Sequence, residues 1–172
     1  MAAQLLEGKA VAASILDEVK KRSAELTAEG VTPGLGTILV GDDGASAGYV
    51  ARKHETCETV GIKSFHIDVG ADKTQADLLA AVDDFNNNLE VDAYLIQYPV
   101  PDQFDFNEAI TRMDPDKDAD GLHPVNLGKL VLQEHGPVPC TPAGIQAMFV
   151  HYGIDISGKE VVVIGRGPTL GR

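Results

Sequence analysis

Residues 37–61, Thr-Ile-Leu-Val-Gly-Asp-Asp-Gly-Ala-Ser-Ala-Gly-Tyr-Val-Ala-Arg-Lys-His-Glu-Thr-Cys-Glu-Thr-Val-Gly, decide the fold class of this chain. The first four are an apolar run without alternation, which is typical of a buried parallel strand. A turn at 41–44 follows, and residues 46–60 are expected to form a helix that Gly61 ends. A strand that passes directly into a helix indicates an α/β layer with a parallel sheet.

Strands and helices alternate on both sides of this stretch. Residues 10–28 are expected to form an amphipathic helix, and residues 33–36 a turn. Residues 64–69 and 91–98 are expected to be strands, and the helix between them starts after Thr74, whose hydroxyl can cap it. The loops past the carboxyl ends of such strands form the ligand crevice. The expected inner faces are Val11, Ile15, Val19 and Leu26 in the first helix, and Leu78, Val82 and Phe85 in the second.

Lys53 is the most informative side chain of the helix at 46–60. At about 100° per residue, one arc of this helix holds Tyr49, Val50, Lys53, Cys57 and Val60. A lysine and a tyrosine therefore share the apolar face. A buried amine loses the hydration of its charged form, which lowers its pKa and lets it move protons near neutral pH. The alternative is a lysine whose ammonium extends past an apolar edge into water.

Composition narrows the class of protein. The 172 residues are 44% hydrophobic and 23% charged, as in a globular protein of one or two domains. No apolar run approaches the roughly 18 residues of a membrane span, and the first residues do not resemble a secretory signal, so we expect a cytoplasmic protein. A net charge of −12 argues against nucleic acid or an anionic membrane as partner.

Cysteine and histidine positions give no sign of a metal site. Cys57 and Cys140 are far apart and lack a Cys-x-x-Cys neighbour, so neither a disulfide framework nor zinc is expected. The five histidines show no metal-ligand spacing. We therefore expect no metal.

Two later segments carry polar or turn signals. Residues 113–126 are rich in aspartate without helical or strand period, and they do not match an EF-hand, so a solvated loop is the simplest expectation. Residues 139–144, Pro-Cys-Thr-Pro-Ala-Gly, are expected at a domain junction. There Thr141 caps a helix and Pro142 takes its first position, and the helix continues to Gly153.

Residues 158–172 combine a strand pattern with a glycine-rich turn. The apolar run 161–164 precedes Gly165, Gly167 and Gly171, a relative of the dinucleotide fingerprint, in which backbone N–H groups approach a pyrophosphate. A purely structural turn is the alternative. Because no further strand, helix or ribose-reading residue follows, we expect a fragment of a longer protein that by itself binds a nicotinamide cofactor poorly.

Five groups of residues, taken in order, resemble the bifunctional methylenetetrahydrofolate dehydrogenase/cyclohydrolase family. They are residues 40–46 with 49–53, 96–101, 116–121 with 123–124, 139–142, and 163–167 with 171–172. Together they span nearly the whole chain, so the resemblance is specific. It implies an α/β fold, with a parallel-sheet, folate-binding N-terminal domain at 1–138 and the beginning of a Rossmann NADP-binding domain at 139–172, and an active site between the two.

The resemblance also implies residue roles. The catalytic residues are Lys53, which moves protons, Tyr49, which orients it or stacks near the folate, and Gln97, which hydrogen-bonds the lysine and helps to keep it neutral. Asp120 matches the aspartate that holds the pterin ring. Substrate contacts are expected at Tyr49, Lys53, Ile96, Gln97, Tyr98 and Asp120, and NADP contacts at Gly165, Arg166 and Gly167.

The implied activity is NADP-dependent oxidation of 5,10-methylenetetrahydrofolate, followed by hydrolysis of the methenyl product to 10-formyltetrahydrofolate. The family is commonly a homodimer through its Rossmann domain. Two positions depart from its pattern: Tyr98 stands where leucine is usual, and Gly167 where serine is often found.

Two other classes of protein remain open. A shikimate-dehydrogenase-like enzyme shares the order of substrate domain and Rossmann domain, although the Gln97 and Asp120 motifs do not suit it. A non-catalytic folate-binding fragment is compatible with an incomplete cofactor domain. Short-chain dehydrogenases also use Tyr-x-x-x-Lys, but their glycine-rich turn precedes the tyrosine, whereas here it follows long after.

Overall fold

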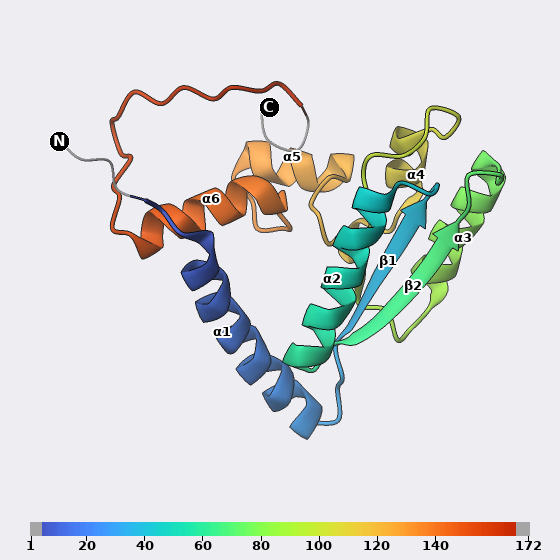
Figure 1. Ribbon diagram of the computed structural model, residues 1–172, viewed down its shortest axis with the longest axis horizontal. Helices are drawn as coiled ribbons and strands as arrows, with labels where there is room; N and C mark the ends of the chain where they lie inside the picture. The colour runs from blue at the N-terminus through green and yellow to red at the C-terminus, as the bar shows by residue number, and fades with distance from the viewer. Residues whose placement is uncertain (1–4, 168–172) are drawn as a thin grey trace.

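The computed structural model describes residues 5–167 of the chain. Its core is a three-stranded parallel sheet with helices on both faces (Figure 1). The elements in chain order are α1 (Gly8–Ala28), β1 (Gly34–Val40), α2 (Gly44–Val60), β2 (Lys63–Val69), α3 (Gln75–Asn87), β3 (Ala93–Ile96), α4 (Phe106–Arg112), a 3-10 turn (Pro115–Lys117), α5 (Pro124–Leu132) and α6 (Cys140–His151).

The sheet has the strand order β2-β1-β3, and both pairs of neighbours are parallel. The side chains of β1 alternate between two layers. Ile38 and Val40 belong to the core cluster that includes the buried residues of α3 and α4, whereas Thr37 contacts His54 of α2. The predicted α/β class with a parallel sheet is confirmed, and the carboxyl ends of all three strands lie at one edge.

Local signals account for most boundaries. Thr74 and Asp77 form a reciprocal capping box at the start of α3, and Gly61 ends α2 in the left-handed conformation (φ 78°), as predicted. The turn expected at 33–36 is wrong, because β1 begins at Gly34. A Cβ at Gly34 would collide with the carbonyl oxygen of Glu90. The glycine is therefore a strand residue that permits close backbone approach.

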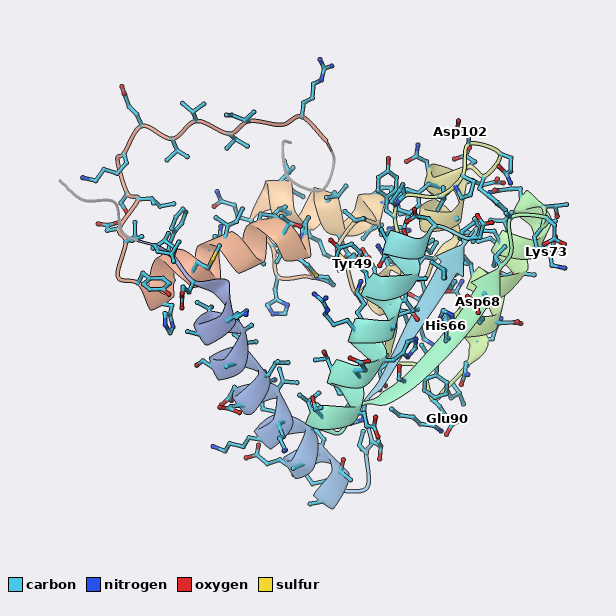
Figure 2. The ribbon with its side chains drawn as sticks, in the orientation of Figure 1. Tyr49, His66, Asp68, Lys73, Glu90 and Asp102 are labelled. Carbon is cyan, nitrogen blue, oxygen red and sulfur yellow. The ribbon has the colours of Figure 1, made fainter. Side chains whose placement is uncertain are left out.

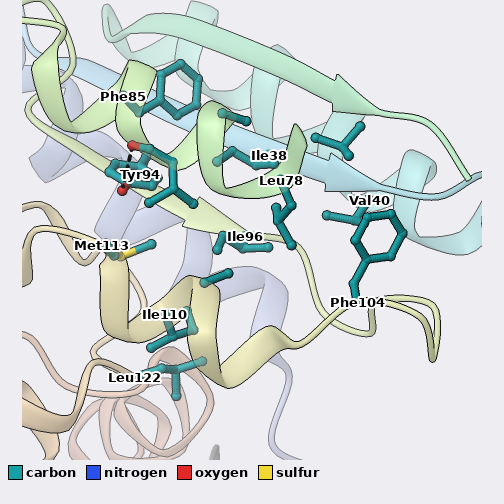
Figure 3. Close-up of a cluster of buried hydrophobic side chains, with 14 of the residues drawn as sticks. Ile38, Val40, Leu78, Phe85, Tyr94, Ile96, Phe104, Ile110, Met113 and Leu122 are labelled. Carbon is teal, nitrogen blue, oxygen red and sulfur yellow. Dashed lines mark hydrogen bonds between the residues drawn. The ribbon is translucent and has the colours of Figure 1, made fainter. Parts of the chain in front are cut away.

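The core lies between the sheet and the pair α3 and α4 (Figure 3). All three inner residues expected for α3 are buried. Tyr94 of β3 is also buried, and its hydroxyl donates to Oδ1 of Asn86 at 2.6 Å. Burial raises the pKa of Tyr94, so this hydroxyl stays a donor. The strand expected at 91–98 is shorter than predicted, since β3 covers only Ala93–Ile96.

Two elements bury less apolar surface than expected. Val11 of α1 is buried, but Ile15 and Leu26 are exposed, although they were expected on the same inner face. The strand expected at 161–164 is wrong: this segment is an exposed, unpaired chain in which Ile164 is 95% exposed. A parallel strand needs a neighbour that supplies ladder hydrogen bonds, and no described strand lies beside it.

The described helices include none that is long and apolar enough to cross a bilayer. Cys57 and Cys140 are both free thiols, the first buried and the second exposed. Within residues 5–167, no group of three or more His, Cys, Asp or Glu side chains is arranged to hold a metal ion.

Candidate functional site

Lys53 is held at the carboxyl edge of the sheet by a single amide. From its half-buried position on α2, its Nζ donates to Oε1 of Gln97 at 2.8 Å. Gln97 follows β3 directly, and its backbone N–H donates to the carbonyl oxygen of Ile38 at 2.8 Å. Its side-chain Nε2 donates to the carbonyl oxygen of Tyr98, also at 2.8 Å. The amide is therefore fixed by the sheet and by the next loop residue, and it fixes Lys53 in turn.

The orientation of this amide changes the role expected for Gln97. A carbonyl oxygen accepts a hydrogen bond from an ammonium or from a neutral amine, and the charged donor makes the stronger bond. The expectation that Gln97 helps to keep Lys53 neutral is therefore wrong. Gln97 holds the position of Nζ in either protonation state.

The charge of Lys53 acts on two further side chains, Asp120 and Cys140. Asp120 is half-buried, and burial raises the pKa of its carboxyl group, while the hydrogen bond from Cys140 and the charge of Lys53 oppose that rise. The Sγ of Cys140 donates to Oδ1 of Asp120 at 3.4 Å. A small cavity of about 70 Å³ opens beside them, lined by Asp120, Leu122 and residues 139–141. A carboxylate at such a cavity can accept hydrogen bonds from the N–H groups of a ligand.

Cys140 is a site residue that the sequence analysis missed. The residue as a whole is exposed, but its sulfur faces Asp120, and burial together with the Asp120 charge raises the pKa of the thiol to about 11. The group is therefore a protonated donor at neutral pH. Its signal was its place in the segment 139–142, just where a helix begins. Because α6 starts at Cys140 with Pro139 as N-cap, the expectation that Thr141 caps it is wrong.

The three other expected substrate contacts differ in what they offer. Tyr49 is 59% exposed and projects outward from α2 (Figure 2), so its predicted place on the buried face is wrong, although Val50 is buried. Ile96 is buried in the core, so its side chain does not face a ligand. Tyr98 is exposed, and its ring packs on Phe106 with 5.1 Å between centroids.

The aspartate-rich segment 113–126 is ordered, so the solvated-loop expectation is wrong. Asp118 is buried, and its Oδ2 accepts from the backbone N–H of His123 at 2.8 Å and from Nδ2 of Asn126 at 2.9 Å. The segment includes the 3-10 turn and the start of α5, a helix that the sequence analysis did not predict. These buried hydrogen bonds fix Asp118, two residues before Asp120, whose carboxyl group lies within range of the Lys53 charge.

Comparison with known proteins assigns this arrangement to a family. The family model for the catalytic domain of tetrahydrofolate dehydrogenase/cyclohydrolase matches residues 6–120. The chain belongs to the tetrahydrofolate dehydrogenase/cyclohydrolase family. The model for the NAD(P)-binding domain of the same family matches residues 139–172. This assignment rules out the shikimate-dehydrogenase-like alternative.

Relatives of the tetrahydrofolate dehydrogenase/cyclohydrolase family are similar along the whole chain. The bifunctional protein FolD of Syntrophotalea carbinolica is 69% identical over 172 residues, which are 100% of this chain and 59% of that protein. The crystal structure of FolD from Campylobacter jejuni matches with a TM-score of 0.95 and 38% identity, over 99% of this chain and 61% of that one. The Trypanosoma brucei enzyme, solved with NADP and an inhibitor, matches with a TM-score of 0.94 and 35% identity, over 99% and 59%. The chain thus spans about three fifths of the length of these relatives.

The residues expected to contact NADP do not form a phosphate cradle. Gly165, Arg166 and Gly167 are exposed and continue the unpaired segment 161–164, and an added Cβ at either glycine would meet no described atom within 4 Å. In a dinucleotide site these glycines let the backbone approach the pyrophosphate and the following helix. The described residues alone therefore do not fit the cofactor. Gly171 and Arg172 lie outside the described residues.

Proposed function

We propose that this chain carries the folate-binding and ring-opening site of a bifunctional enzyme of one-carbon metabolism. The complete reaction is oxidation of 5,10-methylenetetrahydrofolate with NADP⁺, then hydrolysis of the 5,10-methenyl cation to 10-formyltetrahydrofolate. The observation that carries the proposal is the 2.8 Å hydrogen bond between Lys53 and Gln97, with Asp120 within range of the lysine charge. The Campylobacter jejuni relative is a bifunctional methylenetetrahydrofolate dehydrogenase/cyclohydrolase, which supports the proposal.

Ring opening requires a group that accepts and returns a proton. Water adds to the methenyl carbon, the bond from that carbon to N5 breaks, and N5 takes up one proton while the second proton of water is released. Lys53 is the group placed for this task. Its Nζ accepts a proton from the attacking water and delivers one to N5, and Gln97 holds Nζ in position throughout. A positioned acid–base group is typically worth about 10²–10⁴-fold in rate.

The other expected contacts fix the substrate. The Asp120 carboxylate accepts paired hydrogen bonds from the amino group and ring N–H of the pterin, which sets the orientation of the ring. The exposed rings of Tyr49 and Tyr98 offer flat apolar surfaces to an aromatic ligand. Gln97 is proposed as a substrate contact as well as the partner of Lys53. Its amide lies between Lys53 and Tyr98, two other proposed contacts.

The cofactor and the assembly belong to the same proposal. We place the folate domain at 1–138 and the start of the NADP-binding domain at 139–172, with Gly165, Arg166 and Gly167 contacting NADP once further protein packs against them. The whole enzyme is then a cytoplasmic homodimer. The exposed apolar side chains of Val150 and residues 161–164 support contact with additional protein.

The test is Lys53→Met in the enzyme with a complete NAD(P)-binding domain. Methionine keeps the length of the side chain but cannot carry a proton, so ring opening should fall by about 10²–10⁴-fold while folate still binds. The decay of methenyltetrahydrofolate absorbance measures ring opening, and fluorescence quenching measures binding. A mutant that opens the ring at a near-normal rate would remove Lys53 from the mechanism.

A non-catalytic folate-binding module is the second candidate. It is favoured by the unpaired state of residues 161–164, which leaves the described part of the cofactor domain without a sheet. The same absorbance assay separates the two candidates, because a binding module protects methenyltetrahydrofolate or leaves its decay unchanged, whereas the enzyme accelerates it.

A further inference from the structure

A buried threonine links two histidines beneath α2. Thr37 of β1 is 1% exposed, and its Oγ1 lies 3.2 Å from Nε2 of His54 and 2.9 Å from Nδ1 of His66. At the outer ends, His66 Nε2 lies 2.8 Å from Oδ1 of Asp68, and His54 Nδ1 contacts the Oγ of Ser64. His66 and Asp68 are neighbours on one side of β2 (Figure 2). These five residues are called the Thr37 chain below.

The donors and acceptors of the Thr37 chain are consistent with one direction only. An ionised Asp68 can only accept, so Nε2 of a neutral His66 carries the hydrogen and its Nδ1 accepts from the Thr37 hydroxyl. The Thr37 oxygen then accepts from Nε2–H of His54, whose Nδ1 accepts from Ser64. Every polar atom of the chain is satisfied while both imidazoles are neutral.

The hydrogen bonds of the Thr37 chain can hold a first proton and also a second, because the Ser64 hydroxyl can accept from a protonated Nδ1 of His54, but the second proton places two like charges side by side. If His66 gains a proton, its Nδ1 donates to Thr37, whose hydroxyl turns to the carbonyl oxygen of Phe65 at 3.4 Å. A further proton on His54 places two cations in rings whose centroids are 5.1 Å apart. Burial lowers the pKa of His54, and the charge of His66 lowers it further, against the opposing charge of Asp68. Both of these charged groups face His54 from β2.

His54 is also the sequence neighbour of Lys53. Together the two side chains connect one turn of α2 to β1, to β2 and to the residue that follows β3. His54 is bound to Thr37 of β1 and Ser64 of β2. Lys53 is bound to Gln97 at the end of β3. The position of Nζ therefore depends on the same turn that the Thr37 chain holds against the sheet.

We propose that His54 and Thr37 are positioning residues for Lys53, and that a proton on His54, through repulsion between two charged imidazoles, loosens the Thr37 chain, releases this turn of α2 and moves Nζ away from Gln97. The proposal rests on the function proposed above for its activity readout alone. The proposal predicts that the rate of ring opening falls at acid pH because His54, a residue that does not contact the substrate, becomes protonated.

The test uses ¹⁵N-labelled enzyme with a complete NAD(P)-binding domain and follows histidine ring signals and the Gln97 side-chain amide signals against pH. In the wild type, the Gln97 signals should shift together with the titration of His54. His54→Gln, which cannot titrate, should abolish that shift and flatten the acid limb of the ring-opening profile. His151→Gln on α6 is the matched control and should change neither.

Two results would overturn the proposal. One is a wild type in which His54 titrates while the Gln97 signals stay still. The other is His54→Gln with the acid limb of the wild type. Thr37→Val should also uncouple the Gln97 signals from His54, and His54→Gln decides the matter if the threonine variant does not fold. If no ring opening is found at all, the proposed function fails, and the Gln97 signals still decide this proposal.

Discussion

Replacing Gln97 by leucine tests how much the amide contributes to the position of Lys53. Leucine has a similar volume but no acceptor, so the 2.8 Å hydrogen bond to Nζ is lost. A hydrogen bond to a charged group contributes about 1.5–3 kcal/mol. At about 1.4 kcal/mol per factor of ten, ring opening should slow by roughly 10- to 150-fold in the enzyme with its complete NAD(P)-binding domain.

The assay is the decay of methenyltetrahydrofolate absorbance at saturating substrate, with folate affinity measured separately. Gln103→Leu is the matched control. Gln103 lies in the same loop region, and its Nε2 donates to the carbonyl oxygen of Ala71 rather than to any residue near Lys53. The control should keep its rate within about twofold, as surface substitutions usually do. Equal losses in the two variants, or a Gln97→Leu enzyme at full rate, would refute the positioning argument.

Three further predictions follow from other parts of the structure. Asp120→Ala should weaken folate binding in a titration, whereas Asp116→Ala, at an exposed position, should not. Burial raises the pKa of Asp120, so the folate affinity of the wild type should also fall as acid converts the carboxylate to its neutral form. Leu78→Ala should lower the free energy of unfolding by about 2–5 kcal/mol in a urea melt, since Leu78 is fully buried, while Leu89→Ala, 95% exposed, should cost little. The chain 1–172 alone should show no saturable NADP binding by calorimetry at micromolar cofactor, because residues 161–167 are unpaired.

Periodicity and turn chemistry predicted the three strands of the sheet and the helices α1, α2, α3 and α6, but not α4 or α5, because those signals are local. The apolar run at 37–40, the capping residue Thr74 and the stop at Gly61 each act within one or two turns of chain. The turn predicted at 33–36 was wrong because Gly34 is needed for close approach to the carbonyl group of Glu90, which is distant in sequence. The strand predicted at 161–164 was wrong because a strand forms only beside a partner strand.

For the candidate site too, local patterns in the sequence were found and contacts between distant residues were missed. Lys53 was found from its helical face, and its hydrogen bond to Gln97 came from the family resemblance, not from the spacing. Cys140 and Thr37 were missed because the partners of their polar atoms lie 17 to 29 residues away and meet them only in the fold. Tyr49 was assigned to the apolar face because a helical arc shows which residues share one side of a helix, but not which of them the rest of the protein covers.

The position of α6 connects the candidate site to the segment that matches the NAD(P)-binding model. That match begins at residue 139, yet the first residue of α6, Cys140, already hydrogen-bonds Asp120. At the other end of α6, the Tyr152 hydroxyl accepts from the backbone N–H of Glu7 at 2.9 Å and lies 3.2 Å from its carbonyl oxygen. The helix is thus bound at both ends to residues that match the catalytic-domain model. Burial raises the pKa of Asp120. Because the Cys140 thiol at the start of α6 hydrogen-bonds Asp120 and lowers that pKa, a shift of α6 would change the pKa of the carboxylate that is proposed to hold the pterin.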